Sequence, residues 1–102
     1  FNTVIHIWVE IGSVTPLPQP GNNRPRVFRL IEDKGIINRY GFNSIGVGAV
    51  QSKIKCARLK WDEDCALFGV NLGKNKNSDE PKYDYEVGVH NLGPYCDYLV
   101  VN

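Results

Sequence analysis

The stretch "VIHIWVEIGSV" (residues 4–14) is the first of three apolar segments that decide the fold of this chain. β-Branched residues and one tryptophan fill most of its positions, and the run ends at Gly12-Ser13. Runs of this kind are typical of strands that are covered on both faces, as in a parallel sheet. The same pattern predicts further buried strands in "ALFGVNLG" (residues 66–73) and "YLVV" (residues 98–101).

Two helices are expected between these strands. The first carries apolar residues at spacings of three and four, which form the stripe of a helix that packs on a core. This stripe consists of Val47, Val50, Ile54, Ala57 and Trp61. Asn43 or Ser44 is expected as its N-cap. The second helix is expected from a cap at Ser78 to about Leu92, where a glycine and a proline follow.

A long connection separates the first strand from the first helix. Its opening, "TPLPQPGNNRPR" (residues 15–26), holds four prolines. Because proline cannot donate a ladder hydrogen bond, this part is predicted to be an ordered excursion without regular pairing. "VFRL" (residues 27–30) can return as a short strand, and the polar run "INRYGFNS" (residues 37–44) then predicts a turn-like loop.

The order of elements indicates an α/β fold. Buried strands that alternate with helices favour parallel βαβ units with right-handed crossovers. Three such strands would leave unpaired edges, which are an aggregation hazard in an isolated sheet. The chain also contains no methionine. We therefore expect a segment of a larger sheet.

The composition argues against several classes of function. The chain has 102 residues and a formal charge of +1, which gives no support to a nucleic-acid surface or a polybasic membrane anchor. Its apolar runs are shorter than the roughly 18 residues of a membrane span. The three cysteines are widely spaced, so we expect reduced, mostly buried thiols, with neither a metal site nor a disulfide framework. His6 and His90 are expected to be structural.

The candidate site lies where the expected strands end. In parallel α/β sheets ligands bind beyond the carboxyl ends of the strands, and these ends carry Gly12-Ser13, Asn71 and Asn102. The loop of residues 38–44 can reach the same end. Because asparagine offers both an acceptor and a donor, this cluster suits a planar heterocycle with alternating C=O and N–H groups, such as a pyrimidine or a flavin. The simpler alternative is that these asparagines only form turns.

Other kinds of site find little support in the sequence. The residues assemble neither paired carboxylates for acid–base work nor a Ser/His/Asp set. "GVNLGKNK" (residues 69–76) lacks the spacing of a phosphate-binding loop. Lys74 and Lys76 are therefore predicted to be solvated loop charges.

Four long motifs stand out in the chain: "EIGSVTPLPQPGNNRPRVFRL", "INRYGFNS", "GVNLGKNK" and "DYLVVN". They resemble motifs of the class 2 dihydroorotate dehydrogenases, which are membrane-associated and quinone-dependent. Their order and spacing agree with this class from Val9 to Asn102. The resemblance implies an FMN-containing (β/α)₈ barrel that oxidises dihydroorotate to orotate and passes electrons to ubiquinone.

The resemblance also implies roles for single residues. Those implied to bind FMN are Gly12, Ser13, Asn38, Asn71 and Asn102. Those implied to bind dihydroorotate or orotate are Asn38, Tyr40, Gly41, Phe42 and Asn102. Val27 and Arg29 are implied to face the quinone tunnel, and an arginine there can hold a carbonyl or a carboxylate. Arg39 and Ser44 are expected to be structural, in a salt bridge or a cap, and no metal is implied.

The resemblance further implies that residues 1–102 are a partial FMN-binding barrel domain, incomplete at both ends. The family's general base, a serine, is expected on a loop just beyond Asn102, so this chain alone is expected to be inactive. The parent enzyme is expected to be a monomer with no nucleic-acid partner, acting in pyrimidine (UMP) biosynthesis. N-terminal helices outside this chain are expected to hold it at the mitochondrial inner membrane, or at the bacterial inner membrane. A non-catalytic binding module derived from that enzyme is the alternative.

Overall fold

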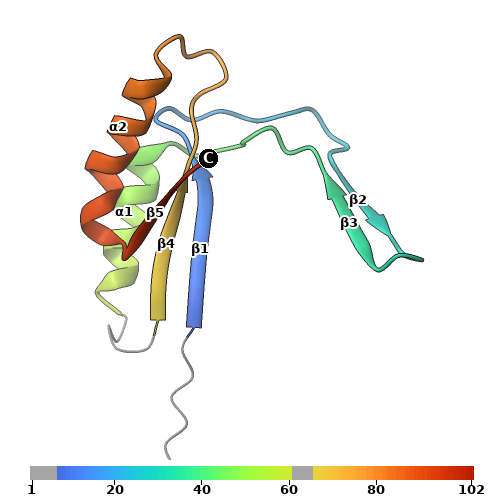
Figure 1. Ribbon diagram of the computed structural model, residues 1–102, viewed down its shortest axis with the longest axis horizontal. Coiled ribbons are helices and arrows are strands. Elements are labelled where there is room, and N and C mark those ends of the chain that lie inside the picture. The colour runs from blue at the N-terminus through green and yellow to red at the C-terminus, as the bar shows by residue number, and fades with distance from the viewer. Residues whose placement is uncertain (1–6, 61–65) are drawn as a thin grey trace, which may run out of the picture.

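The computed structural model of the chain describes residues 7–60 and 66–102. Its main sheet has three parallel strands in the order β1-β4-β5, where β1 is Ile7–Val14, β4 is Ala66–Leu72 and β5 is Tyr98–Val101. The three strands run side by side toward the end of the sheet where the chain terminates (Figure 1). The three predicted strands and their parallel pairing are confirmed.

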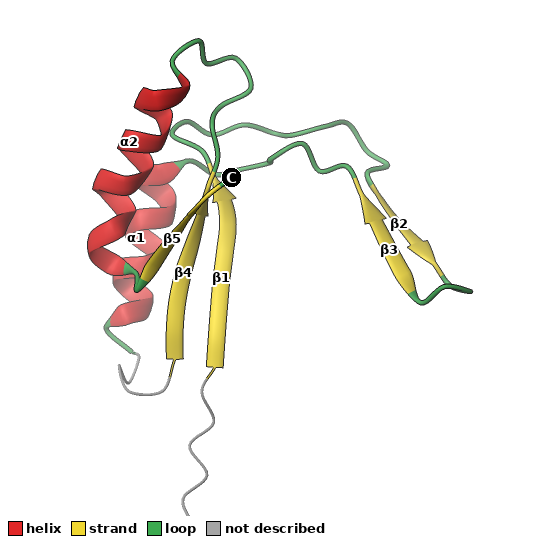
Figure 2. Cartoon of the chain, viewed as in Figure 1, coloured by secondary structure: helices red, strands yellow, loops and turns green. Residues whose placement is uncertain are grey.

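Two helices cover one face of this sheet. These are α1 (Val47–Arg58) and α2 (Pro81–Leu92), which a short 3₁₀ turn, η1 (Gly93–Tyr95), joins to β5. Both helices lie on the same side of the strands (Figure 2). No helix among the described residues is long and apolar enough to cross a membrane. The buried core between the helices and the sheet consists of Val14, Val50, Ile54, Phe68, Val70, Leu72 and Leu92.

The opposite face of the sheet is open in the part of the chain that the structure describes. Trp8 and Glu10 point away from the helices and are exposed, whereas Val9 and Ile11 pack against the core. Within the described residues, β1 is therefore covered on one face, and its predicted cover on the other face stays a prediction. Alternation places every second side chain of β1 on a face that only further elements could cover.

A hairpin forms a second, separate sheet. Strands β2 (Val27–Leu30) and β3 (Gly35–Asn38) pair antiparallel and project away from the main sheet (Figure 1). The sequence predicted β2 but not β3, and it assigned Asn38 to a loop, whereas Asn38 ends β3 opposite Val27. Four residues of "GIIN" carry no strand periodicity of their own, so their pairing with β2 decides their conformation.

Both helix starts differ from the prediction. The N-cap of α1 is Gly46, without a side-chain cap, and the N-cap of α2 is Glu80, whose N–H donates to Ser78 Oγ at 3.2 Å. Ser78 therefore supports the turn before the helix and does not cap it. In the predicted stripe of α1, Ala57 is exposed and Trp61 lies outside the described residues.

The expectation of mostly buried thiols is wrong for one of the two described cysteines. Cys56 is exposed on α1, whereas Cys96 is half-buried before β5, and both are free. Burial raises the pKa of the Cys96 thiol, the Asp97 carboxylate raises it further, and the Arg58 guanidinium partly lowers it. His90 is exposed, and Cys65 and His6 lie outside the described residues.

We expect iodoacetamide at about pH 8 to modify Cys56 at least about tenfold faster than Cys96, because the thiolate is the nucleophile and burial disfavours it. Peptide mass spectrometry after timed quenching measures both rates. The difference between the two modification rates will become smaller as the pH rises toward the raised pKa of Cys96. In denaturant the two cysteines will react at similar rates, and equal rates in the native chain would contradict the prediction.

Candidate functional site

The carboxyl ends of the three strands carry one hydrogen-bonded polar cluster. Ser13, near the end of β1, donates through Oγ to Asn71 Oδ1 of β4 at 2.6 Å. Asn102, directly after β5, donates through Nδ2 to the same Oδ1 at 3.2 Å and lies 3.4 Å from Ser13 Oγ. The predicted meeting of these side chains is therefore confirmed. The bond of Tyr85 OH to the carbonyl oxygen of Asn102 holds the backbone there.

The close approach of β1 to β4 depends on Gly12. The register of the two strands shifts between Ile11 and Val14, and Gly12 has a φ of 144°. A Cβ atom at this position would lie 2.6 Å from the carbonyl oxygen of Asn71. Glycine alone tolerates both the backbone angle and this distance. Gly12 thus lets Ser13 reach Asn71.

The proline-rich excursion holds the loop of residues 39–46 beside the strand ends. Gln19 and Ser44 exchange two backbone hydrogen bonds of 2.9 Å, and Gln19 Nε2 donates to the carbonyl oxygen of Phe42 at 2.7 Å. Asn22 donates through Nδ2 to the carbonyl oxygen of Arg39 at 2.9 Å. Gly41 and Phe42 turn the chain with φ angles of 69° and 55°. The excursion is therefore a scaffold for the loop.

The strand ends, Asn38 and the loop enclose a cavity of about 500 Å³. Seven of the residues that were predicted to bind FMN or the substrate line this cavity, together with Asn43. Asn71 does not line it, but its carbonyl oxygen accepts from Ser13 and Asn102, which do. The lining consists of Gly12, Ser13, Asn38, Tyr40, Gly41, Phe42, Asn43 and Asn102.

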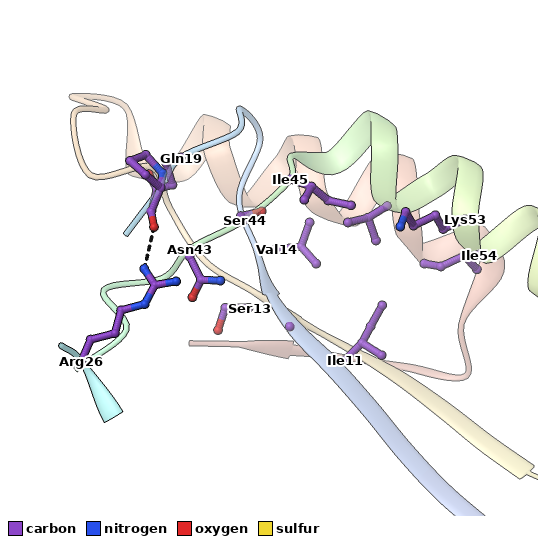
Figure 3. Close-up of a pocket in the computed structure, with 13 residues that line it drawn as sticks. Ile11, Ser13, Val14, Gln19, Arg26, Asn43, Ser44, Ile45, Lys53 and Ile54 are labelled. Atoms are coloured by element: carbon purple, nitrogen blue, oxygen red, sulfur yellow. Dashed lines mark hydrogen bonds between the residues drawn. The ribbon is translucent and has the colours of Figure 1, made fainter. Parts of the chain in front are cut away.

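A second cavity of about 500 Å³ shares Gly12, Ser13 and Asn43 with the first and extends to α1. Figure 3 shows Ser13 and Asn43 between the strand and the loop, with the aliphatic side chains of the lining nearer the helix. Arg26 donates through Nη1 to the carbonyl oxygen of Pro20 at 2.8 Å, drawn as a dashed line in Figure 3. Ser13 and Asn43 are therefore reached from both cavities.

Val27 and Arg29 lie apart from this cluster. Both belong to β2, where Val27 is 42% exposed and Arg29 pairs in register with Ile36 of β3. Val27 lines a smaller cavity of about 260 Å³ with Tyr40 and neighbouring residues of the excursion. The structure therefore separates the two residues predicted for a quinone from the strand-end residues.

Arg39 and Ser44 have structural contacts, as expected, but their partners are backbone groups. Arg39 donates through Nε and Nη2 to the carbonyl oxygen of Pro25, at 3.2 and 3.0 Å, and lies over the ring of Phe28. Ser44 Oγ accepts from the N–H groups of Thr15 and Gly46, both at 3.1 Å. Ser44 therefore joins the excursion to the approach to α1 and is not the N-cap.

Replacing Ser44 with alanine should lower the free energy of unfolding by about 1–2 kcal/mol, because two N–H groups lose their acceptor, one of them in the fully buried Thr15. Urea denaturation followed by circular dichroism measures the change. Ser52→Ala on the exposed face of α1 is the matched control, with an expected change within about 0.5 kcal/mol. Equal losses in the two variants would contradict this role of Ser44.

Three residues have roles here that their sequence positions did not predict. Asn43, predicted as an N-cap, lines both cavities, and Glu10 accepts from Asn71 Nδ2 at 3.3 Å. The sequence signal that could have identified Asn43 as a lining residue was its position within "INRYGFNS", next to the residues predicted to bind the ligands. Lys74, predicted to be solvated, donates to the carbonyl oxygens of Asn75 and Ser78 and shapes the loop after β4.

The site is built from neutral groups. Hydroxyl, amide and phenol side chains line the first cavity, and no cluster of three or more metal-ligating side chains occurs among residues 7–60 and 66–102. Such a set can orient a flat polar ring through paired donors and acceptors. It offers no paired carboxylates for proton transfer.

Comparisons with known proteins agree with this geometry. The family model described as dihydroorotate dehydrogenase matches residues 6–102. The mitochondrial dihydroorotate dehydrogenase (quinone) of Mus musculus is 55% identical over 98 residues, which cover 93% of this chain and 25% of that protein. The dihydroorotate dehydrogenase (quinone) of Rhodospirillum rubrum is 47% identical over 95 residues. The chain spans about a quarter of the length of these relatives.

Solved structures give the same result. The crystal structure of the dihydroorotate dehydrogenase of Eimeria tenella in complex with ferulenol matches 90% of this chain and 25% of its own, with a TM-score of 0.83 and 44% identity. The ligand-free structure from the same organism has a TM-score of 0.79. The described strands and helices are thus part of a (β/α)₈ barrel, and the chain belongs to the dihydroorotate dehydrogenase family.

Proposed function

We propose that residues 1–102 form part of the FMN-binding barrel domain of a quinone-dependent dihydroorotate dehydrogenase, which oxidises dihydroorotate to orotate in pyrimidine biosynthesis. The observation that carries this proposal is the cluster of Ser13, Asn71 and Asn102, which lies beside a cavity lined by Asn38 and Tyr40. The names of the relatives support the activity and the quinone.

The residues present fit a flavin. An isoalloxazine ring has an edge of alternating carbonyl and N–H groups, and the strand-end hydroxyl and amides offer both donors and acceptors to such an edge. Gly12 and Gly41 line this cavity, and neither position has room for a Cβ atom, which would lie within 2.7 Å of Asn71 or Asn22. When bound, FMN supplies the hydride acceptor of the reaction.

The chain's own contribution is orientation of the two rings. Ser13, Asn71 and Asn102 would hold the flavin at the strand ends. Asn38 would contact both ligands, and the Tyr40–Phe42 segment would form the wall of the pyrimidine pocket. We assign to these residues the positioning of the reacting atoms, and we assign proton transfer to the serine expected beyond Asn102.

The hairpin is the part of the chain that we assign to the quinone. Val27 and Arg29 project with β2 away from the strand ends, and the forked donors of Arg29 suit a quinone carbonyl. We place the enzyme at the inner membrane, in mitochondria if the source is eukaryotic, since the eukaryotic relatives carry mitochondrial names. Helices outside the described residues would hold it there.

A chimera tests this function. The matched quarter of the mouse relative is replaced by this chain, and the purified protein is assayed for FMN content and for dihydroorotate-dependent reduction of a quinone. We expect FMN to co-purify and turnover to occur within about tenfold of the unmodified mouse enzyme, which is the control. A folded chimera without flavin, or one with flavin but without turnover, would overturn the proposal.

A further inference from the structure

A second polar chain lies on the open face of the sheet, directly below the strand-end cluster. Glu10 Oε1 accepts from Asn71 Nδ2 at 3.3 Å, and Glu10 Oε2 accepts from Tyr98 OH at 3.2 Å. Tyr98 OH in turn accepts from Trp8 Nε1, and the two rings meet edge to face with centroids 5.7 Å apart. The chain of contacts crosses all three strands.

Gly69 makes this chain possible. It lies in β4 between Glu10 of β1 and Tyr98 of β5, with which it pairs on either side. A Cβ atom on Gly69 would lie 1.9 Å from Cζ of the Tyr98 ring. The ring therefore lies flat across the glycine and brings its hydroxyl group to a carboxylate two strands away.

The carboxylate determines which end of the Asn71 amide faces the site. An ionised carboxylate only accepts hydrogen bonds, so Glu10 selects the NH₂ group of Asn71. The carbonyl oxygen of Asn71 then faces the opposite way, where Ser13 Oγ and Asn102 Nδ2 both donate to it. A reversed Asn71 would set its NH₂ group against the NH₂ group of Asn102 and would require Ser13 Oγ to accept where it now donates.

The orientation of the Asn71 amide in turn fixes the orientation of the Asn102 amide. Its Nδ2 is engaged by Asn71 and Ser13, so its own carbonyl oxygen remains for the cavity that Asn102 lines. Among the contacts of these amides within residues 7–60 and 66–102, the one with Glu10 is to a carboxylate, which accepts only and so distinguishes their two orientations. An acceptor at this point suits an N–H group of a ring and repels a ring carbonyl.

We propose that Glu10 is a positioning residue, which acts through Asn71 to fix Asn102 with its carbonyl oxygen toward a ligand N–H group. The proposal rests on the proposed function, in which that ligand is the flavin or the pyrimidine beside it. Glu10 lies in β1 on the open face and does not line the ligand cavity. Its effect on binding therefore passes through the two asparagines.

Four variants of the chimera test the role of Glu10. Glu10→Leu removes the acceptor, and Glu10→Gln keeps a carbonyl that can accept from Asn71. Asn71→Asp sets two carboxylates against each other, and the double variant Asn71→Asp with Glu10→Gln restores a donor–acceptor pair. Glu86→Leu on the exposed surface of α2 is the matched control. Each apoprotein is titrated with FMN by fluorescence quenching, and the reduction potential of the bound flavin is measured.

We expect Glu10→Leu to weaken FMN binding at least about tenfold, as for a lost hydrogen bond to a charged group, and Glu10→Gln to stay within about threefold. Asn71→Asp should also weaken binding, and adding Glu10→Gln should restore most of the loss. The potential should shift in the variants that lose affinity. The Glu86→Leu control should match the parent chimera.

The outcomes separate this inference from the proposed function. Rescue of Asn71→Asp by Glu10→Gln in a chimera without turnover would support the positioning role and overturn the enzymatic proposal. An active chimera in which Glu10→Leu binds FMN as tightly as the parent would overturn the positioning role alone. If Glu10→Leu fails to fold, absence of rescue in the double variant overturns it. A folded parent chimera that binds no FMN would overturn both.

Discussion

Replacing Gly12 with alanine will lower the free energy of unfolding of the chimera by about 3 kcal/mol or more and will empty its flavin site. Two physical terms add at this position. A positive φ costs a residue with a Cβ atom about 1–3 kcal/mol, and the overlap with the Asn71 carbonyl at 2.6 Å requires β1 and β4 to separate. Separation of these strands also breaks the hydrogen bond between Ser13 and Asn71.

The measurement is urea denaturation of the chimera together with its FMN content. Gly48→Ala is the matched control, because Gly48 lies in α1 with nothing within 4 Å of the added atom. That change should stabilise the protein slightly, by about 0.5–1 kcal/mol, since alanine favours a helix. A Gly12→Ala variant with parental stability and flavin content would show that β1 and β4 do not approach as described.

Replacing Asn71 with alanine will weaken FMN binding about 100-fold, although Asn71 does not line the cavity. Its amide is the centre of the cluster, because it accepts from Ser13 and Asn102 and donates to Glu10. The truncation leaves all three groups without this partner. Ser13 and Asn102 are then free to turn away from the orientation in which we propose that they hold the flavin.

Equilibrium titration of the apo-chimera with FMN measures this loss. Asn77→Ala, in the exposed part of the loop after β4, is the matched control and should bind FMN as the parent does. Circular dichroism spectra and urea midpoints must show that Asn71→Ala remains folded. Unchanged affinity in a folded Asn71→Ala variant would show that the cluster does not hold the cofactor.

Much of the architecture was predictable because it depends on local pattern. The apolar runs of β1, β4 and β5 and the stripe around Val50 and Ile54 carry their own periodicity, and the structure confirms them. The strand β3 carries no such signal, and only its pairing with β2 reveals it. The prediction of Ser44 as a helix N-cap was wrong for a related reason. Ser44 Oγ accepts a hydrogen bond from the N–H group of Thr15, which is distant in sequence.

The candidate site also has a part that the sequence predicted and a part that it did not. Parallel strands end on one side of a sheet, so the meeting of Ser13, Asn71 and Asn102 followed from their positions in the sequence. The part played by Glu10 could not be predicted. It depends on the tyrosine of β5 crossing a glycine of β4.

The sequence by itself determined the type and order of the main strands and helices, and it named the polar residues at the strand ends. The tertiary structure alone decided which amide nitrogen and which carbonyl oxygen of those residues face each other. Residue identity and periodicity specify where a side chain lies along a strand. The direction of an amide instead depends on partners from other strands, and here that partner is the carboxylate of Glu10.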